Sequence, residues 1–140
     1  MNCGTIFRDQ HFQFSDGPEG NKLAVVLCEY GTDYLVVKTT SRVHRKGSTA
    51  GCQITDTPPN FFLPQRSAWF ETDTWIELDE CFEYRSYIQK EKVKDGTSHQ
   101  LHGAQLPLEL MKQIIDCALQ SEDIDEFHLE HLAMMRAKMV

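Results

Sequence analysis

The sequence contains no long hydrophobic run and no segment typical of membrane targeting. No stretch approaches about 18 consecutive apolar residues, the length that a spanning helix needs, and the opening MNCGTIFRDQHF lacks the apolar core of a secretory signal. Glycine-rich phosphate loops, Gly-x-Ser-x-Gly elbows and His-Glu-x-x-His motifs are also missing from the chain. These absences argue against the common motif-bearing nucleotide-binding, hydrolase and metalloprotease classes. They predict a soluble, cytoplasmic protein that does not contact membranes.

The five cysteines are scattered along the chain. The set is odd in number and has no Cys-x-x-Cys pair: Cys3, Cys28, Cys52, Cys81 and Cys117. It predicts reduced thiols that serve as small core residues. Two His-x-x-His pairs, His99 with His102 and His128 with His131, either bind a divalent cation or lie at the surface. Because further ligands at a fixed spacing are lacking, we expect no metal and no cofactor.

Positive charge is in short supply, yet it is concentrated. The net charge is −7, but residues 38–46 carry four basic side chains and no acid. The basic residues of this segment are Lys38, Arg42, Arg45 and Lys46. Hydroxyl groups (Thr39, Thr40 and Ser41) and the imidazole of His44 lie among them in the sequence. The segment is either a solvated turn or a site that binds an anion.

One domain over residues 1–140 is expected at this length. Residues 3–94 are rich in β-branched and aromatic residues with frequent turn signals, which predicts a β-rich body. The expected strands cover 4–7, 11–14, 23–30, 34–41, 61–64, 69–78 and 82–93, with a charged turn after 4–7 and an exposed loop over 94–103. Apolar residues at helical spacing over 106–138 predict two C-terminal helices, the second with an Asp123–Glu126 capping box and an apolar stripe that includes Phe127.

Alternation over WFETDTWIEL (69–78) places two tryptophans on one face of the expected strand. Trp69 and Trp75 share this face with Glu71. If the face is outward, the two indoles can stack on exposed nucleobases. Alternatively, the C-terminal helices or a second subunit cover them.

The order of segments resembles that of PemK/MazF-like proteins over residues 3–93. GTIF, a loop, KLAVVLCEY and YLVVKTTSR resemble the opening of that family, and FFLPQRSAWFETDTWIEL resembles its middle segment. The resemblance implies a small SH3-like β-barrel with appended helices. It also implies a toxin that cleaves single-stranded RNA without a metal, forms a homodimer and is inhibited by an antitoxin protein.

The resemblance carries over to particular residues. Lys22, followed by Leu23, stands where active members have Arg-Pro, and a lysine lacks the planar fork that suits a phosphate. Thr39, or Thr40 with a one-residue shift, matches the threonine that ends the third strand of the family. Glu71 is the nearest match to an acid that some members carry before a later strand.

Metal-free RNA cleavage needs a base, an acid and positive charge on the phosphate. His44 or Glu71 can act as the base, Lys22 or Arg42 can hold the charge, and Thr39 can orient a phosphate oxygen. Arg45 and Lys46 are expected to contact RNA, as are the two tryptophans. Two other functions stay open: a non-catalytic barrel that binds a protein partner or nucleic acid, and a structural domain that dimerises through its helices.

Overall fold

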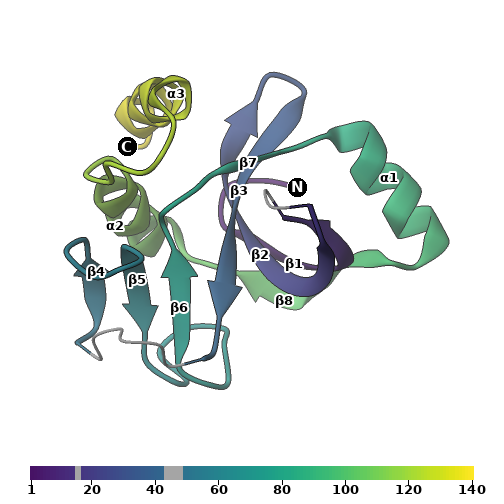
Figure 1. Cartoon of the computed structure of the whole chain (residues 1–140), viewed down its shortest axis with the longest axis horizontal. Helices are drawn as coiled ribbons and strands as arrows, with labels where there is room; N and C mark the ends of the chain where they lie inside the picture. Colours follow the sequence, from purple (N-terminus) through teal and green to yellow (C-terminus); the bar gives the residue numbers. More distant parts are fainter. Residues whose placement is uncertain (15–16, 43–48) are drawn as a thin grey trace.

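The computed structural model describes residues 1–14, 17–42 and 49–140 and is mainly β, with three helices in the part it describes (Figure 1). The strands are β1 (Thr5–Gln13), β2 (Glu19–Tyr30), β3 (Asp33–Thr40), β4 (Gly51–Gln53), β5 (Asn60–Leu63), β6 (Thr74–Glu77), β7 (Phe82–Tyr84) and β8 (Ser98–Gln105). The helices are α1 (Ser86–Asp95), α2 (Leu108–Ala118) and α3 (Glu126–Ala137). The predicted fold class, mainly β with C-terminal helices, is confirmed.

The described strands pair antiparallel throughout, in the order β4-β5-β6-β3-β2-β1-β8. Strand β3 has a divided outer edge, because Tyr34–Val36 pair with β7 and Thr39–Thr40 pair with β6. Among these strands the path has two ends, β4 and β8, so the pairing does not close into a barrel. The sheet therefore wraps its core while remaining open.

The β2–β3 hairpin matches the sequence prediction. The pairing expected between residues 23–30 and 34–41 is present, and Tyr30 lies opposite Asp33 across a turn in which Gly31 has a φ of 63°. This left-handed conformation favours glycine, which lacks a Cβ. The hairpin places Ala24 of β2 opposite Lys38, near the end of β3.

The predicted charged turn near the N-terminus is wrong. Strand β1 continues through Arg8 and Asp9, with a register shift between Asp9 and Phe12. Asp9 is fully buried, and its carboxylate accepts hydrogen bonds at 2.7 Å from both Tyr84 Oη and Lys92 Nζ. A charged residue fits inside the strand here because a cation and a hydroxyl group from distant segments satisfy it.

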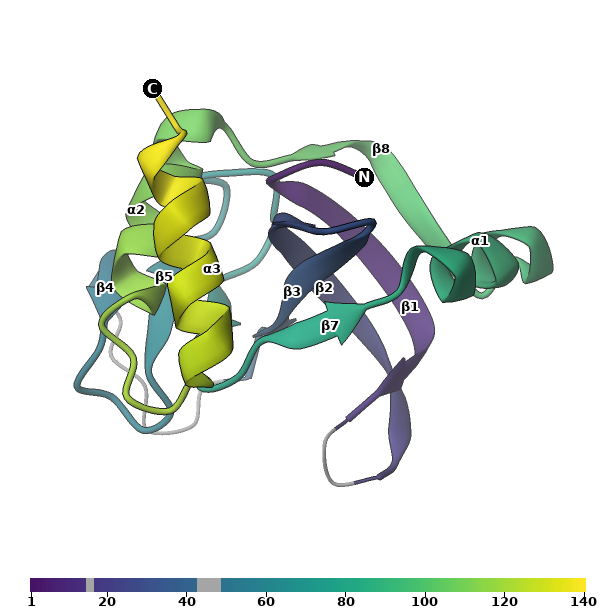
Figure 2. The ribbon, with the colours of Figure 1, turned by 90° about the horizontal axis from the view of Figure 1, so that it is seen from above.

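The strand predicted over 82–93 is confirmed only at Phe82–Tyr84, and the loop predicted over 94–103 is wrong from Ser98 onward. Residues 82–93 contain the short strand β7 and most of helix α1, and the expected loop over 94–103 contains most of strand β8. Helix α1 buries none of its side chains, so its sequence has no apolar stripe from which to infer a helix. It ends at Gly96, which has a φ of 76°. Both views show α1 on the opposite side of the molecule from α2 and α3 (Figures 1 and 2).

The C-terminal helices cover the larger of two hydrophobic clusters. Ile115 of α2 and Leu132 of α3 pack in this cluster with Val25, Val37 and Ile76 of the sheet. Helix α3 is capped by the carboxylate of Asp125, which accepts from the Phe127 amide, so the Asp123–Glu126 box is wrong. The predicted apolar stripe is wrong at Phe127, whose side chain is 74% exposed. None of the helices in the described residues is long and apolar enough to cross a membrane.

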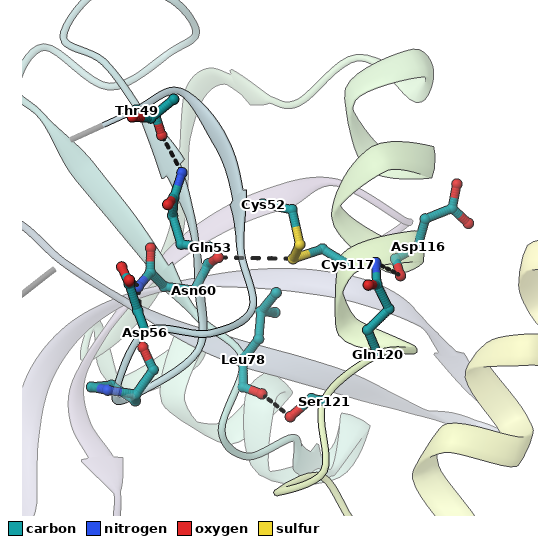
Figure 3. The surroundings of a disulfide bond; sticks show 11 residues. Thr49, Cys52, Gln53, Asp56, Asn60, Leu78, Asp116, Cys117, Gln120 and Ser121 are labelled. Atoms are coloured by element: carbon teal, nitrogen blue, oxygen red, sulfur yellow. Dashed lines mark hydrogen bonds between the residues drawn. A yellow bond between two sulfur atoms is a disulfide. The ribbon is translucent and has the colours of Figure 1, made fainter. Parts of the chain in front are cut away.

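The prediction that every cysteine is reduced is wrong. Cys52 of β4 and Cys117 of α2, 65 residues apart in the sequence, form a disulfide (Figure 3). Beside this bond, Ser121 Oγ donates to the Leu78 carbonyl at 2.7 Å. Cys3, Cys28 and Cys81 are free thiols. The pairing could not be inferred from spacing, because it depends on how α2 packs against β4.

Candidate anion-binding site

A polar cavity of about 510 Å³ lies where β2 enters the core and β3 leaves it. Its cationic lining residues are Arg8, Lys22 and Arg42, and its hydroxyl-bearing lining residues are Thr39, Thr40, Ser41, Thr72 and Thr74. Asn21, Leu23 and Phe70 complete the lining. Strands β1, β2, β3 and β6 and the chain before β6 all contribute to it.

Strand register brings together two residues that the sequence places 17 positions apart. Thr39 Oγ1 donates a hydrogen bond to the Leu23 carbonyl at 2.8 Å, and Lys22 Nζ donates to the Thr39 carbonyl at 3.4 Å. Thr39 is 5% exposed, so its hydroxyl group is held firmly in the sheet. Its proton is engaged by Leu23, and a hydrogen bond to a phosphate oxygen requires that the hydroxyl group change acceptor. In the present geometry Thr39 positions the Lys22 ammonium group.

Arg42 is tied to the end of β3. Its backbone amide donates to Thr40 Oγ1 at 3.2 Å, and its side chain is exposed at the cavity. The local turn fixes the point at which the basic segment leaves the sheet. Residues His44, Arg45 and Lys46 lie outside the described residues.

The charge of the lining favours an anion. Among the described lining residues, three are cationic and none carries a carboxylate or an imidazole. Hydroxyl and amide groups supply further hydrogen-bond donors. Guanidinium, ammonium and hydroxyl groups around one cavity are the groups that bind phosphate oxygens in proteins. The arrangement can therefore hold a phosphate, but the described lining contains no general base.

The other predicted site residues lie elsewhere. Glu71 is exposed in the chain between the lining residues Phe70 and Thr72 and does not itself line the cavity. Trp69 is half-buried and packs edge-to-face on Phe70, with 5.4 Å between the ring centroids. The strand expected over 69–78 is confined to Thr74–Glu77, and its alternation does not extend back to Trp69.

The prediction of an outward Trp75 is wrong. Its side chain is 2% exposed and stacks on Phe62 with 4.9 Å between ring centroids. Both faces of β6 are buried at this point, because Ile76 packs in the main cluster while Trp75 is covered on the opposite face. A buried indole cannot stack on a nucleobase, so Trp75 is removed from the candidate RNA-binding residues.

Two residues that line the cavity, Arg8 and Asn21, carry no signal in the sequence. Arg8 of β1 lines it, and Arg8 Nη1 donates to Asn21 Oδ1 of β2 at 3.2 Å. His99 of β8 pairs with Arg8 across the sheet, so the two side chains point to the same face. Sequence reasoning misses Arg8 and Asn21, and it assigns His99 only to a His-x-x-His pair, because strand register alone brings these residues together.

A second cavity, of about 660 Å³, has the opposite charge. Its acidic lining residues are Asp79, Glu80, Glu83, Asp123 and Asp125. His128 Nε2 lies 3.3 Å from Glu83 Oε1 there, and His131 Nε2 lies 2.7 Å from the Glu29 carbonyl oxygen. Both imidazoles pack edge-on against Tyr30, so in this structure the second His-x-x-His pair docks α3 on the β2–β3 hairpin.

The buried cysteines are poor nucleophiles. Burial raises the pKa of the Cys28 and Cys81 thiols to about 12. Both groups are therefore protonated at neutral pH, and only a thiolate attacks efficiently. Cysteine-based covalent catalysis is not supported at these two positions.

No family model matches the chain, and neither the curated proteins nor the solved structures include a significant match to it.

Proposed function

We propose that the protein is a toxin-like, metal-independent endoribonuclease that acts on single-stranded RNA, with an SH3-like barrel fold of PemK/MazF type. One observation carries the proposal: Lys22, Thr39 and Arg42, selected from the sequence, line one cavity whose described residues carry positive charge only. The described sheet is antiparallel and packs on the larger of two hydrophobic clusters, and its closure into a barrel is part of the proposal.

The proposed reaction is an internal transesterification. The ribose 2′-oxygen attacks the adjacent phosphorus as its proton passes to a base, and the P–O5′ bond breaks as an acid protonates the leaving oxygen. The products are a 2′,3′-cyclic phosphate and a 5′-hydroxyl end. Lys22 and Arg42 stabilise the charge that develops on the phosphate oxygens. His44, Glu71 and His99 are the candidate proton-transfer residues.

A second function, RNA binding without cleavage, is favoured by a different observation. The described lining lacks a carboxylate or imidazole, and Glu71 lies outside it. A cavity of this kind can hold a phosphodiester without activating the 2′-hydroxyl group. A protein partner at the same cavity would need acidic groups to match its charge.

The test is cleavage of a mixed-sequence single-stranded RNA in excess EDTA, with wild type compared to Arg42→Ala and Thr39→Ala. Arg42→Ala removes a contact to the transition-state phosphate and is expected to slow cleavage by about a hundredfold or more. Thr39→Ala keeps the carbonyl that accepts from Lys22 and removes only the hydroxyl group that now donates to Leu23, so a comparable loss in this variant would mean that the hydroxyl group changes acceptor when RNA binds. Arg136→Ala is a matched control, because Arg136 pairs with Asp116 on the C-terminal helices. Binding of the RNA by clean wild-type protein without cleavage would establish the second function instead, and absence of both would refute the proposal.

The proposal includes a homodimer and an antitoxin partner. Phe127 and Met134 of α3, 74% and 49% exposed, are seven residues apart and so lie on one face of the helix. This exposed apolar face suits a protein contact. Light scattering of wild type and Phe127→Ala tests the homodimer: a monomeric wild type removes it from the proposal.

A further inference from the structure

The cavity contains an arginine that the sequence motifs do not identify. Arg8 lies on β1 opposite Leu23 of β2, one position from Lys22. Its side chain is half-buried and lines the cavity with Lys22 and Arg42. Three separate strand or turn segments thus direct a cation toward one space.

The Arg8 guanidinium is held in place by an amide. Arg8 Nη1 donates to Asn21 Oδ1 at 3.2 Å, and both residues line the cavity. A guanidinium has five N–H donors, so four remain after this bond. No carboxylate of the described residues forms a salt bridge with Arg8. Its positive charge is therefore not paired with a carboxylate among the described residues.

The chemistry of Lys22 makes such an arginine useful. An ammonium group is a point charge, whereas a guanidinium can donate two parallel hydrogen bonds to two oxygens of one phosphate. Lys22 also directs its ammonium group to the Thr39 carbonyl. An arginine at this cavity can donate the two parallel hydrogen bonds that a lysine cannot.

We propose that Arg8 binds a phosphate of the RNA through its guanidinium fork and that Asn21 is its positioning residue. The inference rests on the proposed function for the identity of the ligand, a phosphodiester of single-stranded RNA. It assigns the phosphate contact to a residue of β1, outside the segments that suggested the site.

The first experiment measures RNA affinity by fluorescence anisotropy at several salt concentrations. Arg8→Ala should weaken binding by about ten- to a hundredfold, the equivalent of one charge-assisted hydrogen-bonded contact. It should also make the slope of log K against log salt less negative by about 0.7. The matched control is Arg85→Ala, since Arg85 is an exposed residue at the start of α1 whose side chain makes no cap hydrogen bond.

Two further variants separate the positioning of the Arg8 guanidinium from its charge. Arg8→Lys keeps the charge, so the salt slope should stay at the wild-type value while affinity falls several-fold. Asn21→Ala should likewise lower affinity without changing the slope. Arg8→Ala binding within twofold of wild type, in protein with a native circular dichroism spectrum, overturns the inference.

A second measurement distinguishes failure of the inference from failure of the proposed function. The NMR signal of the Arg8 Nε–H group is assigned with Arg8→Lys and followed while inorganic phosphate, and separately RNA, is added. If this signal shifts with phosphate but the protein does not bind RNA, Arg8 binds an anion and the RNA function is refuted. RNA binding without a shift of this signal refutes the Arg8 contact alone. An unchanged signal with both ligands, together with no RNA binding, refutes both.

Discussion

The Cys52–Cys117 disulfide is expected to contribute a large share of the stability of this protein. The bond joins residues 65 apart, and β4, which carries Cys52, is only three residues long. Cross-linking a loop of this length lowers the entropy of the unfolded chain by an amount equivalent to about 4 kcal/mol at 25 °C in the chain-entropy model. Whole domains are stable by only about 5–15 kcal/mol, so this is a substantial fraction.

The assay is urea unfolding of wild type and Cys52→Ala, each with and without a reducing agent. Wild type should lose about 2–4 kcal/mol on reduction, the usual range for a native disulfide. Cys52→Ala should already be destabilised by that amount and should not respond to the reducing agent. Because Cys52 is exposed, its own side chain adds little packing to the difference.

A thiol count supplies the control. Denatured, unreduced wild type should contain three thiols that react with a thiol reagent, those of Cys3, Cys28 and Cys81. Reduction should raise the number of reactive thiols to five. Five thiols before reduction, or equal stability of wild type and Cys52→Ala, would refute the reasoning. Confirmation would also weigh against the predicted cytoplasmic location, where disulfides are rare.

Three further predictions concern the core. Lys92→Met should cost about 3–5 kcal/mol in urea unfolding, because it leaves the buried Asp9 carboxylate without its cation; Asp9→Asn in the same background should recover part of that loss. Trp75→Ala should cost about 3–5 kcal/mol, with RNA affinity of the folded fraction retained, since the indole is buried; a selective loss of affinity would return Trp75 to the site. Cys28 and Cys81 should resist iodoacetamide at pH 8 in native protein, because pKa values of about 12 keep them protonated, and they should react once urea unfolds the chain; fast labelling of folded protein would contradict this.

Sequence patterns predict the elements that have a strong period and fail where tertiary contacts decide. The β2–β3 hairpin and α2 have clear apolar patterns, and both lie close to the predicted positions. Helix α1 has none, because it buries no side chain and is tied to the sheet by polar contacts, which include Lys92 with Asp9 and the Ser86 amide with Asp33. Strand β8 has the composition of a polar loop and is recognised only by its pairing with β1.

The candidate site is predictable in part for the same reason. Arg42 is selected by the concentration of basic residues over 38–46, whereas Lys22 and Thr39 are selected only by the predicted resemblance in segment order. Arg8 and Asn21 follow only from the register between β1 and β2. Trp75 shows the converse error, since alternation predicts which side chains share a face but not whether that face is covered.

The salt dependence of RNA binding should report how many of the selected cations take part. The protein carries a net charge of −7, so attraction to RNA must be local to the cavity rather than spread over the surface. Arg8, Lys22 and Arg42, each neutralising one phosphate, give a slope of about −2 for a single strand. A slope near −3.5 would indicate five phosphate contacts, which is the number expected if Arg45 and Lys46 also bind phosphates. A slope near zero would mean that these cations hold no phosphate, and the site would then have to be sought elsewhere on the molecule.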